Sequence, residues 1–292
     1  MKDCIEQLEA SGDYRVIARL QPRDTYHEEA AVEKKIGIYL DTETTGFDPA
    51  TDKVIELAMV PFEYDDAGRI YRVLPAYNGL ADPGFPIPPV VTKVTGITDD
   101  LVKGQSLDLE AVKACLANAE IVIAHNASFD RPFCEQLLAD FENVAWGCSQ
   151  RDINWNEEGF EGVKLEYLAY KFGFFYDGHR ATVDCQAGIE LLSRQLPGSG
   201  EFVLKRLLDT ASINLVRLWA KGAPFDKKDS LKQRGYRWNT GDDGQPKAWY
   251  TDIPQATLDA EMAYLNEHIY PRAIWILPTR VLDANIRYSK RI

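Results

Sequence analysis

One short stretch limits what this chain can fold into more than any other. The apolar run KIGIYL (residues 35–40) leads directly into DTETTG (residues 41–46), and such a run is typical of a buried strand. Because side chains alternate faces along a strand, the carboxylates of Asp41 and Glu43 point to the same side. Two acids that close repel each other and lose hydration. The stretch therefore predicts either a cation site at a strand end or a pair of solvated acids.

Two later stretches deliver further acids. AHNASFDRPF (residues 124–133) predicts a strand end and then a helix, with Asp130 in the first turn, where the helix dipole favours an acid. GHRATVDCQAG (residues 178–188) places His179 on a loop and Asp184 on the following helix. Each residue alone is common as a surface group. Together, four carboxylates and one imidazole at element ends favour a site for two Mg²⁺ or Mn²⁺ ions, roughly 3.5–4 Å apart, over a zinc site.

These stretches carry a family resemblance. DTETTG, HNASFD and HRATVD occur in the order of the three motifs of the DnaQ-like DEDDh 3′–5′ exonuclease family, which residues 35 to about 195 resemble. That family includes the proofreading epsilon subunit of bacterial DNA polymerase III. The loop PIPPVVTKVTGIT also resembles the loop that precedes the first long helix in this family. The resemblance implies an RNase H-like fold, with a mixed five-stranded sheet flanked by helices.

The resemblance also implies roles for single residues. Four acids would hold the two metal ions: Asp41, Glu43, Asp130 and Asp184. His179 would be the general base that takes a proton from the attacking water, a task that suits imidazole near neutral pH. Thr44 and Thr45 would contact the terminal nucleotide. The products would be a nucleoside 5′-monophosphate and a strand one residue shorter.

The order of elements predicts the domain organisation. Strands first follow one another across short turns and then alternate with helices, which favours a mixed α/β sheet covered by helices. LPGSGEF (residues 196–202) is the best linker candidate. We expect an N-terminal extension over residues 1–33, the exonuclease domain over 34–196 and a small α+β C-terminal domain over 197–292.

Basic and aromatic residues gather in the C-terminal part. The net charge is −12, yet from residue 200 onward 15 Lys and Arg outnumber 11 Asp and Glu. Aromatic side chains can stack on bases while basic groups meet phosphates. The candidate nucleic-acid-binding residues are Lys232, Arg234, Tyr236, Arg237 and Trp238. Alternating aromatic residues are equally consistent with the core face of a small sheet.

Other features narrow the function classes. The chain contains no P-loop, dinucleotide-binding or esterase motif. It has no apolar run of about 18 residues and no N-terminal signal-peptide pattern, so we expect no membrane span and a cytoplasmic location. Five scattered cysteines without a CxxC pair favour reduced thiols.

The resemblance therefore implies a metal-dependent 3′–5′ exonuclease that acts on the 3′ end of DNA, with single-stranded DNA as the expected substrate. Such an activity fits proofreading or DNA repair, with a DNA polymerase or another replication or repair protein as a partner. Two alternatives stay open. One is a 3′–5′ exoribonuclease of the same superfamily, because these motifs do not read the 2′-hydroxyl. The other is a non-catalytic nucleic-acid-binding or polymerase-associated module.

Overall fold

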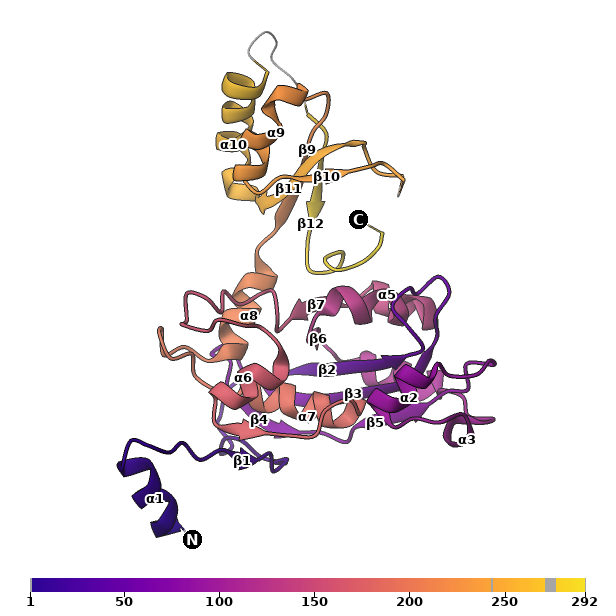
Figure 1. The fold of residues 1–292 in the computed structure, drawn as a ribbon, viewed down its shortest axis with the longest axis vertical. Helices are drawn as coiled ribbons and strands as arrows, with labels where there is room; N and C mark the ends of the chain where they lie inside the picture. Colours follow the sequence, from indigo (N-terminus) through magenta and orange to yellow (C-terminus); the bar gives the residue numbers. More distant parts are fainter. Residues whose placement is uncertain (1, 243, 271–276, 292) are drawn as a thin grey trace. The chain divides into compact units, whose positions relative to one another are not determined.

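The computed structural model describes residues 2–242, 244–270 and 277–291, and the chain forms two compact units (Figure 1). The first unit comprises residues 1–210 together with Tyr288–Arg291 near the C-terminus. The second unit comprises residues 211–287. The last residues of the chain therefore return to the first unit.

A mixed sheet forms the centre of the first unit, with the strand order β4-β3-β2-β6-β7. Its strands are β2 (Lys35–Thr44), β3 (Val54–Tyr64), β4 (Ile70–Val73), β5 (Tyr77–Leu80), β6 (Ile121–Ala124) and β7 (Ala145–Cys148). Strands β2, β3 and β4 form an antiparallel meander, whereas β2, β6 and β7 are parallel. The expected mixed α/β class is confirmed. The sheet has six strands instead of five, because β3 is long enough to pair with both β4 and β5.

Helices cover both faces of this sheet (Figure 1). They are α2 (Pro89–Thr95), α3 (Asp99–Val102), α4 (Leu109–Leu116), α5 (Ala127–Leu137), α6 (Leu165–Lys171), α7 (Ala181–Leu192) and α8 (Val203–Ser212). Helix α7 lies directly on β2 and β3. A Cβ atom on Gly188 of α7 would lie 1.9 Å from the Tyr39 ring of β2. Glycine at this position therefore allows α7 to approach the central strand.

The opposite face of β2 packs on α4 and α5. The shared core contains Ile38, Leu40, Val112 and Phe133. Because side chains alternate along β2, Ile38 and Leu40 point to this face, while Tyr39 points toward α7. Burial on both faces explains why the strand reads as a continuous apolar run.

The N-terminal extension braces helix α7. It contains α1 (Lys2–Ala10) and β1 (Ala18–Arg19), and β1 pairs in parallel with β8 (Phe174–Phe175). The Arg23 guanidinium donates three hydrogen bonds to the buried Glu190 of α7, at 2.7 and 2.9 Å from Nη2 and at 3.3 Å from Nε. The extension therefore holds the outer side of a helix that also carries Asp184.

The first unit continues past the linker expected at residues 196–202. Helix α8 packs on β7, since a Cβ atom on Gly147 would lie 2.6 Å from the Leu207 side chain. Val203, Leu204 and Leu207 are all fully buried. The first compact unit accordingly reaches Thr210 and does not end at residue 196.

The second unit is a four-stranded antiparallel sheet with helices, so the expected small α+β domain is present. Its elements are β9 (Leu215–Ala220), α9 (Lys228–Gln233), β10 (Arg237–Asn239), β11 (Ala248–Pro254), α10 (Leu258–Tyr264) and β12 (Thr279–Leu282). The strand order β10-β11-β9-β12 and the β-α-β-β-α-β sequence match the ferredoxin-like arrangement. Its core includes Leu218, Leu231 and Leu265.

Within the described ranges, none of the helices combines the length and the apolar character that crossing a bilayer requires.

Candidate active site

Three of the predicted acids meet at the carboxyl end of β2. Asp41 and Glu43 come from β2, and Asp184 comes from the first turn of α7. One carboxylate oxygen from each lies within 4.8 Å of the others. The backbone N–H of Arg180 donates to Asp184 Oδ2 at 3.1 Å and so orients this carboxylate. The close approach of α7 to β2 at Gly188 is what brings Asp184 to the strand.

The fourth acid, Asp130, lies beside this group on α5. It is buried, and its Oδ1 accepts hydrogen bonds from the Thr42 backbone N–H at 3.1 Å and from the Thr42 hydroxyl at 2.8 Å. Asp130 is not one of the three clustered acids, but its charge is the strongest electrostatic influence on Asp41. Thr42 therefore anchors Asp130 next to the cluster.

Burial raises the pKa values of these acids, and the charges of neighbouring acids add to it at Asp41, Glu43 and Asp130. Burial raises the pKa of Asp41 well above its usual range, and the charges of Asp130 and Asp184 raise it further. Burial, with the charge of Asp184, raises the pKa of Glu43 to about 8. Burial raises the pKa of Asp130 to about 7, against the opposing effect of the Thr42 hydrogen bonds. Burial likewise raises the pKa of Asp184.

These four acids fit the divalent cations that the sequence predicts. Negative charge in such a cluster is relieved either by protons or by bound cations. The donors are carboxylate oxygens, the ligands that hard cations prefer. The buried thiols of Cys134 and Cys185 lie near the acids, but burial raises their pKa values well above the usual range, which disfavours the thiolate that zinc binds.

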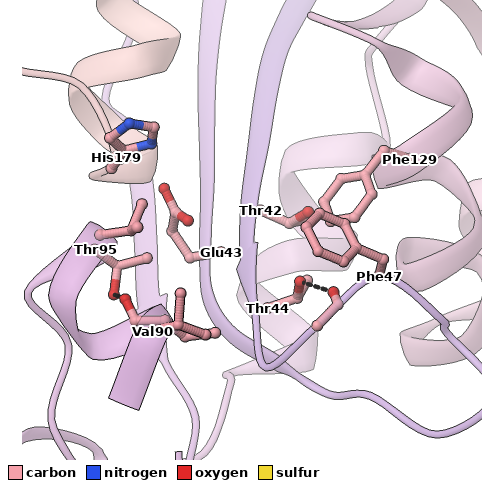
Figure 2. Close-up of a pocket in the computed structure, with 11 residues that line it drawn as sticks. Thr42, Glu43, Thr44, Phe47, Val90, Thr95, Phe129 and His179 are labelled. Carbon is pink, nitrogen blue, oxygen red and sulfur yellow. Dashed lines mark hydrogen bonds between the residues drawn. The ribbon is translucent and has the colours of Figure 1, made fainter. Parts of the chain in front are cut away.

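His179 lies across the cleft from Glu43 (Figure 2). Its side chain is exposed, and its φ angle of 68° is in the left-handed region, which is uncommon for a residue other than glycine. The next residue, Arg180, donates from Nε and Nη2 to the two oxygens of Glu56, at 3.1 and 3.0 Å. The backbone N–H of Ala181 donates to the same carboxylate at 3.2 Å.

The Glu56–Arg180 pair was not predicted from the sequence. Glu56 lies on β3 directly opposite Glu43 of β2, and it is fully buried. The pair fixes the start of α7 immediately after His179, so it holds the unusual backbone of that loop in place. The available signal was a single acid inside the apolar run VIELAMV (residues 54–60), where a charge needs a partner.

Glu43 and His179 line a cleft of about 360 Å³ with a largely apolar wall. Phe47 follows β2 and is 89% exposed, and its ring packs edge-on against Phe129 of α5 with 6.2 Å between the ring centres. Val90 of α2 lies on the other side (Figure 2), and Val94 of the same helix also lines the cleft. None of these four residues has a distinctive signal in the sequence, because apolar side chains on helices and loops resemble core positions.

The two threonines predicted to bind substrate differ in their surroundings. Thr44 lines the cleft, and its hydroxyl donates to the carbonyl oxygen of Gly46 at 2.5 Å. Thr45 is buried in the turn after β2, where its hydroxyl bonds to Asp52 at 3.1 Å and its backbone N–H donates to the Lys53 carbonyl at 2.9 Å. Thr45 therefore shapes the turn that presents Phe47.

The five basic and aromatic candidates of the second unit divide into two groups. Tyr236 is buried and donates its hydroxyl to Glu261 at 3.0 Å, and Arg234 Nε donates to the same side chain at 3.1 Å. Both contacts hold α9 against α10. The buried Tyr236 is therefore not part of an exposed surface, whereas the Arg234 side chain stays 39% exposed beside its ion pair with Glu261. Lys232, Arg237 and Trp238 are exposed.

Comparison with known proteins gives the family. The model of the RNase_T exonuclease family matches residues 38–192, just over half of the chain. This chain belongs to the RNase_T exonuclease family. The matched residues of this RNase_T-family protein include the three clustered acids, Asp130 and His179.

Individual relatives of this RNase_T-family chain are distant. The PolC-type DNA polymerase III of Caldanaerobacter subterraneus subsp. tengcongensis is 27% identical over 229 residues, which are 73% of this chain and only 16% of that polymerase. The DNA polymerase III subunit epsilon of Treponema pallidum is 30% identical over 165 residues, covering 53% of this chain and 74% of the subunit. A zinc-bound E. coli ExoI–ssDNA complex has a TM-score of 0.50 at 14% identity, covering 87% of this chain and 66% of that one. This last likeness concerns the fold alone.

Proposed function

We propose that this protein is a metal-dependent 3′–5′ exonuclease that releases nucleoside 5′-monophosphates from the 3′ end of single-stranded DNA. The observation that carries the proposal is the meeting of Asp41, Glu43 and Asp184 within 4.8 Å, beside an exposed histidine, in a chain of the RNase_T exonuclease family. Relatives of this chain named as DNA polymerase III epsilon and PolC support DNA as the substrate.

We propose that the acids hold Mg²⁺ or Mn²⁺. Asp41, Glu43 and Asp184 would provide the main ligands, and Asp130 would contribute from α5. When bound, such cations supply positive charge that stabilises the transition state of phosphodiester hydrolysis. Their charge would also relieve the repulsion that raises the pKa values of these carboxyls.

His179 would act as the general base. An imidazole nitrogen of His179 would accept the proton of the attacking water, and the exposed position of the side chain leaves it able to return that proton to solvent. The Glu56–Arg180 pair would hold the loop so that the imidazole faces Glu43 across the cleft.

The apolar wall of the cleft would receive the terminal nucleotide. Its volume lies within the range of ordinary ligand sites, about 300–1,000 Å³. A base can stack on an exposed aromatic ring regardless of its identity, and Phe47 and Phe129 offer such rings. Thr44 would contact the terminal nucleotide, while Thr45 would act through the turn.

A nuclease assay with end-labelled strands tests the proposal. Linear single-stranded DNA, labelled at the 3′ or the 5′ end, is incubated with Mg²⁺, Mn²⁺ or a chelator. We expect immediate release of labelled mononucleotide from the 3′ end, and no release in the chelator or with Asp41→Ala. The matched control Asp66→Ala removes an exposed acid that pairs with Lys35, and it should keep full activity.

Two results would contradict the proposal. One is an Asp41→Ala variant as active as the wild type, and the other is release that begins at the 5′ end. The same assay with an RNA strand of the same sequence distinguishes the proposed DNA exonuclease from an exoribonuclease. We further propose a cytoplasmic role in proofreading or repair beside a DNA polymerase, supported by the names of these relatives.

A further inference from the structure

Aromatic rings and lysines contact one another at helix α9 and the neighbouring strands of the second unit. Phe225, just before α9, is 80% exposed, and Lys228 Nζ lies 4.4 Å from its ring centre. Lys232 follows one helical turn later, with Nζ 5.9 Å from the ring centre of Trp249. Trp238, which is 48% exposed, packs edge-on against Trp249 at 5.6 Å. We call these five residues the α9 stripe.

The fold of the second unit does not require the exposed rings of this stripe. Its core consists of buried side chains such as Leu218, Leu231 and Leu265. Trp249 packs against that core, but Phe225 and Trp238 leave large apolar surfaces in solvent. Solvent exposure of large aromatic side chains commonly marks a binding surface.

The lysines of the stripe are placed over rings and not over acids. Within the ranges that the structure describes, neither Lys228 nor Lys232 forms an ion pair with a carboxylate. Their ammonium groups therefore keep their charge available next to aromatic faces. Lysine is depleted at the centres of protein–protein interfaces, whereas rings flanked by cations suit stacked bases and phosphates.

We propose that the α9 stripe binds single-stranded nucleic acid. Bases stack on Phe225 and Trp238, and phosphates contact Lys228 and Lys232. This surface recognises the strand along its length and needs no strand end, so it adds a second mode of binding to the proposed exonuclease function. Stacking and phosphate contacts do not read base identity or the 2′-hydroxyl, so the stripe accepts DNA and RNA alike.

Circular single-stranded DNA tests the proposal, because it offers no end to the catalytic cleft. The affinity of the full-length protein for a labelled circle is measured by fluorescence anisotropy in chelator, at several salt concentrations. The Lys228→Ala/Lys232→Ala variant should bind more weakly, with a salt slope smaller by about 1.4, since each phosphate contact on a single strand contributes about 0.7. Phe225→Ala and Trp238→Ala should each weaken binding about five- to a hundred-fold.

A matched control uses two exposed lysines of the first unit, Lys103 and Lys113. The Lys103→Ala/Lys113→Ala variant should bind the circle with nearly wild-type affinity. Phe225→Ala keeps the test valid if Trp238→Ala disturbs folding, because the Phe225 side chain lies almost entirely in solvent.

The proposal is overturned if the Lys228→Ala/Lys232→Ala variant keeps both the affinity and the salt slope of the wild type. It is also overturned if the control pair weakens binding as much. The exonuclease proposal is judged separately by digestion of linear strands. If the protein digests linear DNA but does not bind the circle, the exonuclease proposal stands and the proposal for the α9 stripe fails. If it binds the circle but does not digest linear DNA, only the exonuclease proposal fails.

Discussion

At the scale of single residues, the main feature of the site is the charge repulsion among Asp41, Glu43 and Asp184. Their carboxylate oxygens lie within 4.8 Å of one another, and burial raises the pKa of each. A fold that gathers partly buried acids in this way is destabilised by their charges at neutral pH unless protons or cations compensate. The ions that the proposed chemistry uses would therefore also stabilise the site.

This repulsion predicts how the stability of the metal-free protein depends on pH. The pKa of Glu43 rises from 4.5 to about 8 on folding, so the folded state keeps a proton that the unfolded chain releases. The stability that this proton provides is present below pH 4.5 and is lost as the pH rises through 8. A difference of one in pKa corresponds to about 1.4 kcal/mol. The titration of Glu43 alone therefore lowers the free energy of unfolding by on the order of 4–5 kcal/mol as the pH rises across this range.

Urea unfolding in chelator at pH 5.5 and at pH 8 measures this effect. We expect a lower free energy of unfolding at pH 8, a smaller difference between the two pH values in Glu43→Gln, and a larger gain from Mg²⁺ or Mn²⁺ at pH 8. Equal stability at both pH values, with no effect of metal, would show that the acids do not repel one another.

His179 gives the second prediction at this scale. His179→Ala should lower kcat by about 10²–10⁴-fold, the usual range for loss of a general base. The variant should keep the wild-type gain in thermal stability from Mn²⁺, because His179 is not one of the clustered acids. His268→Ala, which removes a half-exposed histidine of the second unit, serves as the control. A His179→Ala variant with unchanged kcat would remove this role.

At the scale of elements, the site depends on how closely α7 approaches β2. The contact of Gly188 with the Tyr39 ring leaves no room for a side chain. The Tyr39 hydroxyl bonds to Ser149 at 2.8 Å, which fixes the ring against the helix. The positions of Asp184 and of the His179 loop follow from this packing, because both lie at the start of α7.

Gly188→Ala should therefore damage stability and activity together. The added methyl group forces α7 away from β2, at a cost of about 1–3 kcal/mol. Displacement of Asp184 should lower kcat at saturating Mn²⁺. Gln186→Ala, on the same helix, should change neither property by much. Urea unfolding and mononucleotide release measure the two effects, and a Gly188→Ala variant that loses neither would contradict the packing argument.

At the scale of the whole molecule, the chain leaves the first unit after α8 and returns to it at its end. Tyr288 donates to Asp152 at 2.5 Å, and the Ser289 hydroxyl donates to Glu135 of α5 at 2.7 Å. Arg291 also bonds to Glu135, which in turn pairs with the buried Arg131. The second unit is therefore tethered to the first at both of its ends.

Removal of residues 288–292 should destabilise the first unit by about 1–3 kcal/mol, because partners of buried polar groups on α5 are lost. Differential scanning calorimetry of the shortened chain should show a lower transition temperature for the first unit and an unchanged transition for the second. Ser289→Ala is the milder matched variant. An unchanged transition of the first unit would show that the tail contributes nothing.

Local patterns explain which parts could be predicted from the sequence. The apolar run before Asp41, and the helix that carries Asp184, are visible in the order of residues alone. The Glu56–Arg180 pair joins residues 124 positions apart, and the apolar wall of the cleft depends on where α2 packs, so neither has a local signal. The burial of Tyr236 could not be predicted, because alternating aromatic residues look the same in sequence whether they face a core or a ligand.

Calorimetric titration of Mn²⁺ into the metal-free protein at pH 8 tests the central claim most directly. We predict measurable binding by the wild type and by Asp66→Ala, and binding at least tenfold weaker, as an order of magnitude, for Asp41→Asn and Asp184→Asn. Wild-type affinity in both of these variants would contradict the claim that these carboxylates form a cation site.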